Sequence, residues 1–185
     1  DARVLTHFER VWPELQRAKR PTPALLESLG SPKLLELRRR IAARVRQGKK
    51  VVVFSQWRRM LRLAEWVTRD VLEEQGARAA FFTGGNRKTR DDELVRFHDD
   101  PSVRVLFATD AGGVGLNLQR AASCVMNLDL PWNPAVLEQR IARVHRHGQL
   151  KPVEVVCFVS EGIERHIEQV VGGKQALFRG LFDGR

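Results

Sequence analysis

Five short apolar runs separated by amphipathic stretches constrain the fold of this chain more than any other feature. Each run is rich in Val, Phe and Ala and is apolar at odd and even positions alike, which is typical of a strand buried on both faces. The runs cover residues 51–55, 78–82, 103–108, 123–128 and 153–159. Because strands that alternate with helices form a parallel sheet with helices on both faces, the sequence predicts an α/β fold. In such a sheet, ligands bind beyond the carboxyl ends of the strands.

The stretches between the runs carry apolar residues at the spacing of a helix with one buried side. We therefore predict helices before and after the first run, over residues 88–98 and over residues 134–146. The positions expected to face the sheet are Leu34, Leu37, Ile41, Val45, Leu61, Ala64, Val67, Val71, Leu94, Phe97, Leu137, Ile141 and Val144.

The N-terminal part differs because prolines at positions 13, 21, 23 and 32 interrupt the helical pattern. We expect a helix near residues 2–18 followed by an extended link, so that residues 1–30 form a helical and extended N-terminal segment. Residues 31–185 then form one domain, as the length of 185 residues favours. A further helix is expected over residues 163–182.

The net charge and the cysteine positions limit which binding partners and which metal or disulfide sites are expected. The chain has 32 Lys and Arg against 22 Asp and Glu, a net charge of +10, which favours anionic partners and above all nucleic acid. No run approaches the roughly 18 apolar residues of a membrane-spanning helix, so we expect a soluble protein without a membrane partner. Cys124 and Cys157 lie in apolar runs without zinc-site spacing, which predicts reduced core thiols and no metal site.

Residues 139–149 are the most informative segment. On a helix, Gln139, Arg143 and Arg146 fall within about 60° of one another, opposite the apolar stripe, and Gly148 ends the helix. Two guanidinium groups on one side suit a polyphosphate, because each presents a fixed fork of donors and stays charged. A solvated basic helix face is the alternative.

This segment, Gln139 to Gln149, resembles motif VI of the Swi/Snf-type ATPases in helicase superfamily two. Ala142 and His147 depart from the usual pattern, but neither occupies a candidate arginine position. Further motifs follow in the family's order: residues 51–57 resemble motif IV, 83–97 the block between motifs IV and V, 108–118 motif V, 129–134 the segment that joins motifs V and VI, and 31–34 the opening helix. The likeness spans residues 31–180.

The resemblance implies the C-terminal, RecA-like lobe of a double-stranded DNA translocase, whose partners are DNA and the first RecA-like lobe. It places arginine fingers at Arg143 and Arg146 and nucleotide contacts at Gln139, Asn117 and Gly115. It leaves the location open between a bacterial cytoplasm, associated with the nucleoid, and a eukaryotic nucleus. The implied DNA contacts are Ser55, Gln56, Trp57, Thr83, Gly84, Thr109, Gly112, Trp132 and Asn133.

The sequence pattern, apart from the resemblance, supports some of these implied DNA contacts, which together we call the DNA track. Glycines at 112, 113 and 115 follow the strand that ends at Thr109, and they let backbone amides approach a phosphate closely. A dinucleotide-binding loop does not fit, because Leu118 stands where the third glycine belongs, whereas a tight turn without a ligand stays open. Trp132, next to Pro131, is expected to be exposed, while Trp57 suits either an exposed or a core position.

The chain lacks the phosphate-binding half of an ATPase. Gly48-Lys49 and Gly173-Lys174 have neither the preceding glycine nor the following hydroxyl of a phosphate-binding loop. We therefore expect ATP and Mg²⁺ to be held mainly by a first lobe that precedes residue 1, and the chain alone to be inactive. Two alternatives remain: a non-enzymatic basic nucleic-acid-binding module, and a lobe of a strand-separating helicase of the same superfamily.

Overall fold

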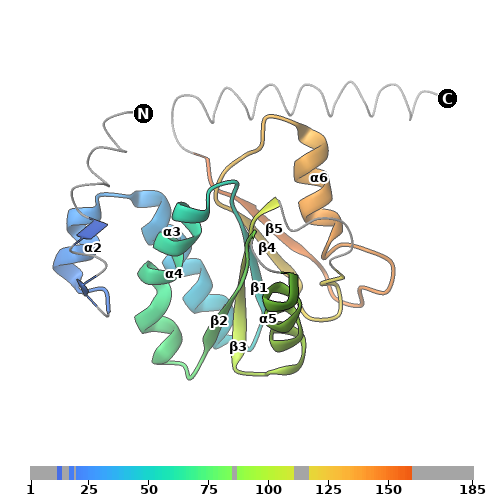
Figure 1. Cartoon of the computed structure of the whole chain (residues 1–185), viewed down its shortest axis with the longest axis horizontal. Helices are drawn as coiled ribbons and strands as arrows, with labels where there is room; N and C mark the ends of the chain where they lie inside the picture. The colour runs from blue at the N-terminus through green and yellow to red at the C-terminus, as the bar shows by residue number, and fades with distance from the viewer. Residues whose placement is uncertain (1–11, 14–16, 19, 85–86, 111–116, 160–185) are drawn as a thin grey trace.

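A computed structural model of the chain describes residues 12–13, 17–18, 20–84, 87–110 and 117–159. Within these ranges the chain forms a five-stranded, wholly parallel sheet with the order β2-β3-β1-β4-β5 (Figure 1). The predicted strands and the α/β class are confirmed. The strands are β1 (Val51–Phe54), β2 (Arg78–Phe82), β3 (Val103–Ala108), β4 (Cys124–Asn127) and β5 (Glu154–Cys157).

The carboxyl ends of all these strands lie in register. Ala108 at the end of β3 pairs with Phe54 of β1 and Phe82 of β2, and Asn127 at the end of β4 pairs with Phe54 and with Cys157 of β5. The loops that follow the strands therefore leave the sheet along one edge, which we call the carboxyl edge. The opposite end, where the strands begin, is the amino edge.

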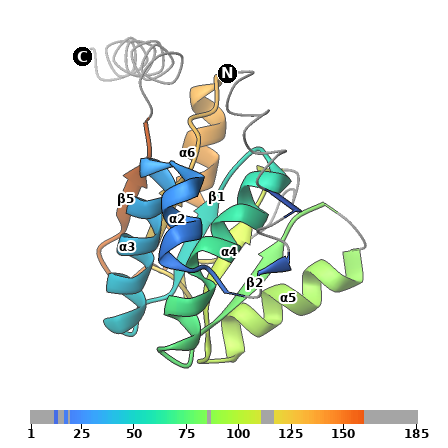
Figure 2. The same ribbon diagram turned by 90° about the vertical axis from the view of Figure 1, so that its left-hand side faces the viewer.

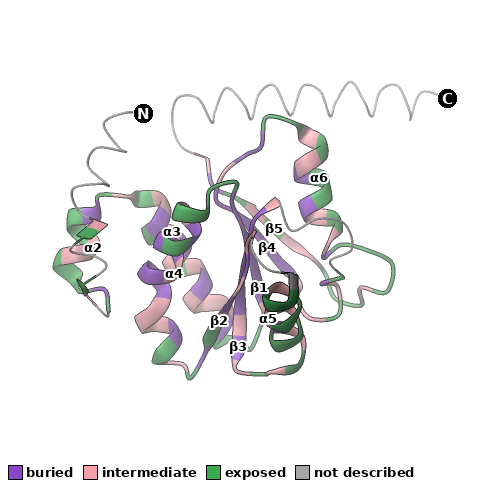
Figure 3. Cartoon of the chain, viewed as in Figure 1, coloured by how far each residue is buried: buried purple, intermediate pink, exposed green. Residues whose placement is uncertain are grey.

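Burial differs between the centre and the sides of the sheet. All residues of β1 and β4 are buried, whereas β2 and β5, the outer strands, are buried only in part (Figure 3). The expectation that every strand is buried on both faces, and that both cysteines are core thiols, is therefore wrong for β5. Its Cys157 is exposed, and its sulfur accepts a hydrogen bond from the Asn127 side chain, whereas burial raises the pKa of the Cys124 thiol to about 12.

Helices cover both faces of the sheet, as predicted (Figures 1 and 2). Helices α3 (Pro32–Arg46) and α4 (Arg58–Glu73) pack on one face, with α2 (Pro23–Leu29) on their outer side, and α5 (Arg87–Asp99) packs on the other face. The predicted apolar stripes of α3 and α4 are buried except for Val71, which is half-buried. Helix α6 (Pro134–Ala142) stands beside the carboxyl edge. Among the described residues, no helix combines the length and the apolar character that a membrane span requires.

The N-terminal segment contains a helix where an extended link was expected. Pro23 and Pro32 occupy the first turns of α2 and α3, where a proline has no hydrogen bond to lose. The Thr22 side chain accepts a hydrogen bond from the backbone N–H of Leu25 and so caps α2. Leu29 joins the main core, so this segment packs on the lobe. Most of the helix predicted for residues 2–18, and all of that predicted for 163–182, lies outside the described residues.

Candidate nucleotide and DNA interface

Side chains at the carboxyl edge tie the ends of two neighbouring strands together. Asp129 follows β4, and its carboxylate accepts hydrogen bonds from the Ser55 hydroxyl and, at 3.1 and 3.2 Å, from the backbone N–H of Gln56, both of which follow β1. The Ser55 oxygen in turn accepts the backbone N–H of Trp57 at 3.1 Å. The loop that leads from β1 into α4 is therefore held by a carboxylate from β4.

Arg140 of α6 lies at the centre of the hydrogen-bond network at this edge, and its side chain is completely buried. Its guanidinium forms two bonds to the Asp110 carboxylate, at 2.6 and 2.7 Å, and one of 3.2 Å to that of Asp129. It also donates to the backbone carbonyl of Asp129 at 2.9 Å and to the Asn127 side chain at 3.3 Å. Burial acts to lower the pKa of Arg140, but Asp110 and Asp129 outweigh it and raise the pKa. Arg140 therefore fixes α6 to the ends of β3 and β4.

The sequence reasoning missed Arg140, although a signal was present. Position 140 falls on the same helical stripe as Leu137, Ile141 and Val144, which are all apolar. An arginine on a buried stripe needs carboxylate partners, and Asp110 and Asp129 follow two of the predicted strands. These three residues together indicate a buried ion-pair network.

Helix α6 ends earlier than predicted. Its last residue is Ala142, and residues 143–148 form turns, with φ of 90° at Gly148. The carbonyl of Arg143 accepts the backbone N–H of Leu118 at 2.9 Å, and the carbonyl of Val144 accepts the Gln149 side chain at 3.2 Å. These carbonyls therefore accept hydrogen bonds from residues outside the helix, and the helix does not continue. The prediction that Gln139, Arg143 and Arg146 share one helix face is wrong, because Arg146 lies beyond the helix.

Of the two candidate finger arginines, Arg143 lies close to this edge, and Arg146 lies in the turns that follow α6. Arg143 is half-buried beside Asp110 and Arg140: burial lowers its pKa, Asp110 opposes that change, and Arg140 adds to it. Arg146 is exposed and donates a hydrogen bond of 2.7 Å to the side chain of Asn117, which brings two predicted site residues together. Gln139 is exposed on α6, and Gly115 lies outside the described residues.

The residues implied as DNA contacts line the same edge in different states of burial. Trp57 and Trp132 are 66% and 60% exposed, as predicted for Trp132. Asn133 caps α6 by accepting the backbone N–H of Ala135 at 3.0 Å. Gln56 is exposed, and Thr83 and Gly84, which follow β2, are half-buried.

Two of the predicted contacts are not at the surface. Ser55 is fully buried, with its hydroxyl bonded to Asp129, so its side chain serves the loop rather than an external ligand in this conformation. Thr109 is 3% exposed, and among the described residues its hydroxyl oxygen has no hydrogen-bond partner. Gly112 lies outside the described residues.

The chemistry of this edge suits phosphate oxygens. Arg143 offers a planar set of donors near an edge where parallel sheets bind ligands, and Arg146 offers another in the turns after α6. Among the described residues, no group of three or more His, Cys, Asp or Glu side chains could hold a metal ion. The carboxylates of Asp110 and Asp129 are bonded to Arg140, so they do not fit the role of magnesium ligands.

Several known proteins are similar to this chain in sequence. The profile of the helicase conserved C-terminal domain matches residues 32–148. DNA repair protein RAD5B of Arabidopsis thaliana is 40% identical over 136 residues, which are 72% of this chain and 10% of that protein. An uncharacterized ATP-dependent helicase, YqhH of Bacillus subtilis (strain 168), is 35% identical over 130 residues, 70% of this chain and 22% of that protein. The chain thus corresponds to less than a quarter of either relative.

A solved structure agrees in fold and sequence. The Sulfolobus solfataricus SWI2/SNF2 ATPase core in complex with dsDNA superposes with a TM-score of 0.64 at 26% identity, covering 97% of this chain and 42% of that one. The motif order, the parallel sheet and the similarities to known proteins all indicate the same family. The chain therefore belongs to the helicase conserved C-terminal domain family and, within it, to the C-terminal RecA-like lobes of Swi/Snf-type ATPases of helicase superfamily two.

Proposed function

We propose that this chain is the second motor lobe of an ATP-dependent translocase on double-stranded DNA and that it supplies arginine fingers to ATP held by the first lobe. The observation that carries the proposal is the position of Arg143, half-buried at the carboxyl edge next to the Arg140–Asp110 pair. Arg146 is hydrogen-bonded to Asn117, whose neighbour Leu118 donates its backbone N–H to the carbonyl of Arg143.

Electrostatics explain why an anion fits beside Arg143. Burial and the nearby Arg140 both lower the pKa of Arg143, so its positive charge is held at some energetic cost. A phosphate oxygen placed against Arg143 would offset this cost, most of all as negative charge develops during phosphoryl transfer. ATP brings that phosphate only when the two lobes close, which couples lobe closure to hydrolysis.

Further residues complete the proposed nucleotide contacts. Gln139 is exposed on α6, and Asn117 is already within hydrogen-bond distance of Arg146. Gly115 stays a prediction on the resemblance alone. ATP and Mg²⁺ are proposed to bind mainly to the first lobe, because this sequence has no phosphate-binding loop. The chain without that lobe is accordingly proposed to be inactive.

The DNA track is proposed to run along the loops that follow β1 to β4. Its support is the clustering of Gln56, Trp57, Thr83, Gly84 and Trp132 beyond the register-aligned strand ends. Contacts from such loops to phosphates position a protein on DNA without reading its sequence. Ser55 and Asn133 are proposed to act by holding the loop and capping the helix that carry the two tryptophans, and Thr109 and Gly112 to contribute the turn after β3.

The test uses the full-length protein and measures ATP hydrolysis with and without duplex DNA. Arg143→Ala is expected to lower DNA-stimulated turnover roughly 10³-fold or more, the range of an arginine finger, with duplex affinity nearly unchanged. Arg46→Ala is the matched control, because Arg46 is an exposed arginine at the end of α3, away from the carboxyl edge. Turnover of Arg143→Ala within about threefold of the parent protein would rule out the finger role.

A second measurement separates the alternatives. Adding the first lobe to this chain in trans is expected to create DNA-stimulated ATPase activity, whereas a non-enzymatic binding module would bind DNA and gain none. A strand-separating helicase would in addition unwind a forked duplex. The proposed translocase would displace a bound block from intact duplex without unwinding it.

A further inference from the structure

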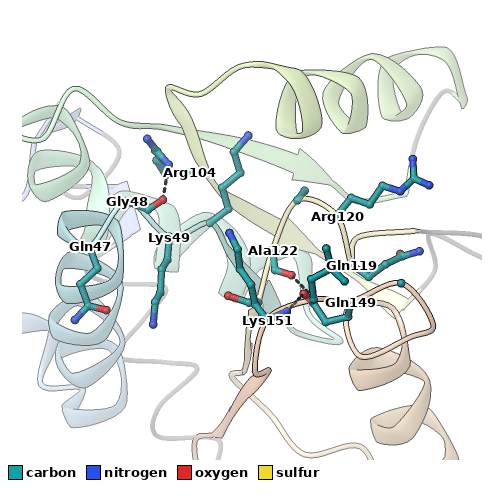
Figure 4. Close-up of a pocket in the computed structure, with 14 residues that line it drawn as sticks. Gln47, Gly48, Lys49, Arg104, Gln119, Arg120, Ala122, Gln149 and Lys151 are labelled. Carbon is teal, nitrogen blue, oxygen red and sulfur yellow. Dashed lines mark hydrogen bonds between the residues drawn. The ribbon is translucent and has the colours of Figure 1, made fainter.

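The amino edge of the sheet holds a cavity of about 810 Å³ that the proposed motor function does not use (Figure 4). Its walls come from the loop before β1, the loop before β4 and the loop before β5, together with the first part of β3. The lining includes five cationic side chains and no carboxylate: Lys49, Lys50, Arg104, Arg120 and Lys151. It lies at the opposite end of the strands from Arg143.

Three of these cations are available to a ligand. Lys49, Arg120 and Lys151 are exposed, and none of them forms an ion pair with any described residue. Glu154, a nearby carboxylate at the start of β5, is already bonded to Arg44 at 2.6 Å. No ion pair among the described residues therefore neutralises the charges of Lys49, Arg120 and Lys151, although Glu154 lies near enough to Lys49 for that lysine to lower the pKa of Glu154.

The other two cations, Lys50 and Arg104, are hydrogen-bonded to backbone carbonyls in the wall of the cavity. Lys50 donates to the backbone carbonyls of Phe97 and Asp100, and Arg104 donates to that of Gly48 at 2.6 Å. Burial and, to a smaller extent, the charge of Arg104 lower the pKa of Lys50, while Asp100 and Asp99 oppose this change. These two side chains are committed to the protein and leave the outer three to contact a ligand.

An apolar side chain lies among these charges. Leu150, next to Lys151, is 94% exposed, and it lines the cavity together with Ala121. A site for phosphate groups alone gains nothing from an exposed leucine, whereas a peptide can bury it. The cavity volume also lies within the range of sites that enclose a ligand.

We propose that this cavity binds an acidic peptide segment of a partner protein, with carboxylates on Lys49, Arg120 and Lys151 and one apolar side chain packed on Leu150. The positive charge of the cavity favours a negatively charged partner, and the exposed Leu150 favours a peptide over DNA. A duplex is stiff over such distances and would touch the rim of a concave site without filling it. The length of β1 separates the cavity from the DNA track by about 13 Å, so both surfaces can be occupied together.

The experiment uses the full-length protein and a short fluorescein-labelled peptide of Asp and Glu around a central Leu-Phe pair, measured by fluorescence anisotropy. The double substitution Lys49→Glu and Lys151→Glu is expected to weaken peptide binding about tenfold or more, because it replaces attraction by repulsion. The pair Arg58→Glu and Arg59→Glu is the matched control, with the same change in net charge on exposed residues of α4. It should leave peptide affinity within about twofold, because salt screens charges at that distance.

Leu150→Ser separates a peptide site from a phosphate site. It is expected to weaken binding of the Leu-Phe peptide about fivefold or more, and to leave binding of inorganic triphosphate unchanged. Equal peptide affinity in the parent protein and the Lys49/Lys151 variant would overturn the proposal. So would a result in which duplex DNA or triphosphate competes fully at this site while Leu150→Ser has no effect on the peptide. Circular dichroism and thermal unfolding establish that each variant is folded.

Discussion

At the carboxyl edge of the sheet, Arg140 is fully buried among Asp110, Asp129 and Asn127. At the amino edge, by contrast, Lys49, Arg120 and Lys151 are exposed around an open cavity. Both edges belong to the same sheet, yet the charge of Arg140 is paired within the protein, whereas Lys49, Arg120 and Lys151 form no ion pair with a described residue. A buried guanidinium must have its donors satisfied, because an unpaired buried charge is very costly. An exposed lysine has water as a partner and needs no such arrangement.

The comparison separates two ways in which positive charge serves function. The paired Arg140 holds the end of α6 and the loops after β1, β3 and β4 in one geometry, as a site for positioned phosphate chemistry requires. The unpaired cations at the amino edge can rearrange around a partner of varied shape. A rigid site and an adaptable site can thus share one sheet because they use its opposite ends.

The largest expected effect on folding comes from Arg140→Ala. Removing this side chain leaves the carboxylates of Asp110 and Asp129 without their cation, which is expected to destabilise the protein by about 3–5 kcal/mol. Arg120→Ala at the amino edge is expected to change the free energy of unfolding by less than about 0.5 kcal/mol. Urea unfolding followed by circular dichroism measures both values.

A combined variant refines that prediction. Arg140→Met together with Asp110→Asn removes the cation and one carboxylate at once, so it is expected to recover part of the loss seen in Arg140→Ala. If the single and the combined variants lose the same stability, the network contributes through packing rather than through charge, and the contrast between the two edges fails.

A smaller effect is expected for Ser55→Ala. This change removes one donor from the Asp129 carboxylate and the acceptor for the backbone N–H of Trp57, at a cost of about 1–3 kcal/mol. Duplex affinity should fall only as far as the loop that carries Trp57 loses its order, so the neighbouring Trp57→Ala should weaken DNA binding more. Unchanged stability with a loss of duplex affinity would instead indicate that Ser55 contacts DNA directly.

The smallest effect concerns the ion pair between Arg44 and Glu154 at the amino edge. The hydrogen bond from Arg44 lowers the pKa of Glu154 below its usual value of 4.5. Because the folded pKa is depressed, the pair contributes stability that is fully present above pH 4.5 and is lost as the pH falls through the folded pKa. Since both side chains are partly exposed, the contribution is expected to be below about 1 kcal/mol.

Glu154→Gln measures this contribution. The variant should be slightly less stable than the parent protein at neutral pH, and the difference should shrink below pH 4.5. Thermal unfolding across this pH range detects the change. A difference that persists unchanged in acid would show that Glu154 acts through packing or through its neutral form.

Local patterns were sufficient to predict most of the fold. The apolar runs around Val51, Arg78, Val103, Cys124 and Glu154 are strands to within two residues of their predicted bounds, because continuous apolar character identifies a buried strand. The helices α3 and α4 were predicted from a different pattern, apolar residues at helical spacing, which identifies a helix with one buried side. The helix at Pro23–Leu29 was missed, because the prolines were interpreted as interruptions although they also start helices.

The candidate site was predicted in part. The sequence placed Arg143, Arg146 and Asn117 in one region, and the structure brings the last two into hydrogen-bond contact. It did not reveal that Ser55 is turned inward to Asp129, because a serine after a strand has the same local pattern whether it is buried or exposed. Nor did it reveal the cavity at the amino edge, whose walls come from loops far apart in the chain.

The sequence by itself determined the alternation of strands and helices, the sign of the surface charge and the family motifs, since all of these depend on residues close together in the chain. Only the tertiary structure decided where α6 ends and what Arg140 does. The N–H of Leu118 takes the carbonyl of Arg143, and carboxylates from two different strands meet at one guanidinium. Such contacts join residues up to 30 positions apart in the sequence, and they form only when the sheet brings its strand ends together.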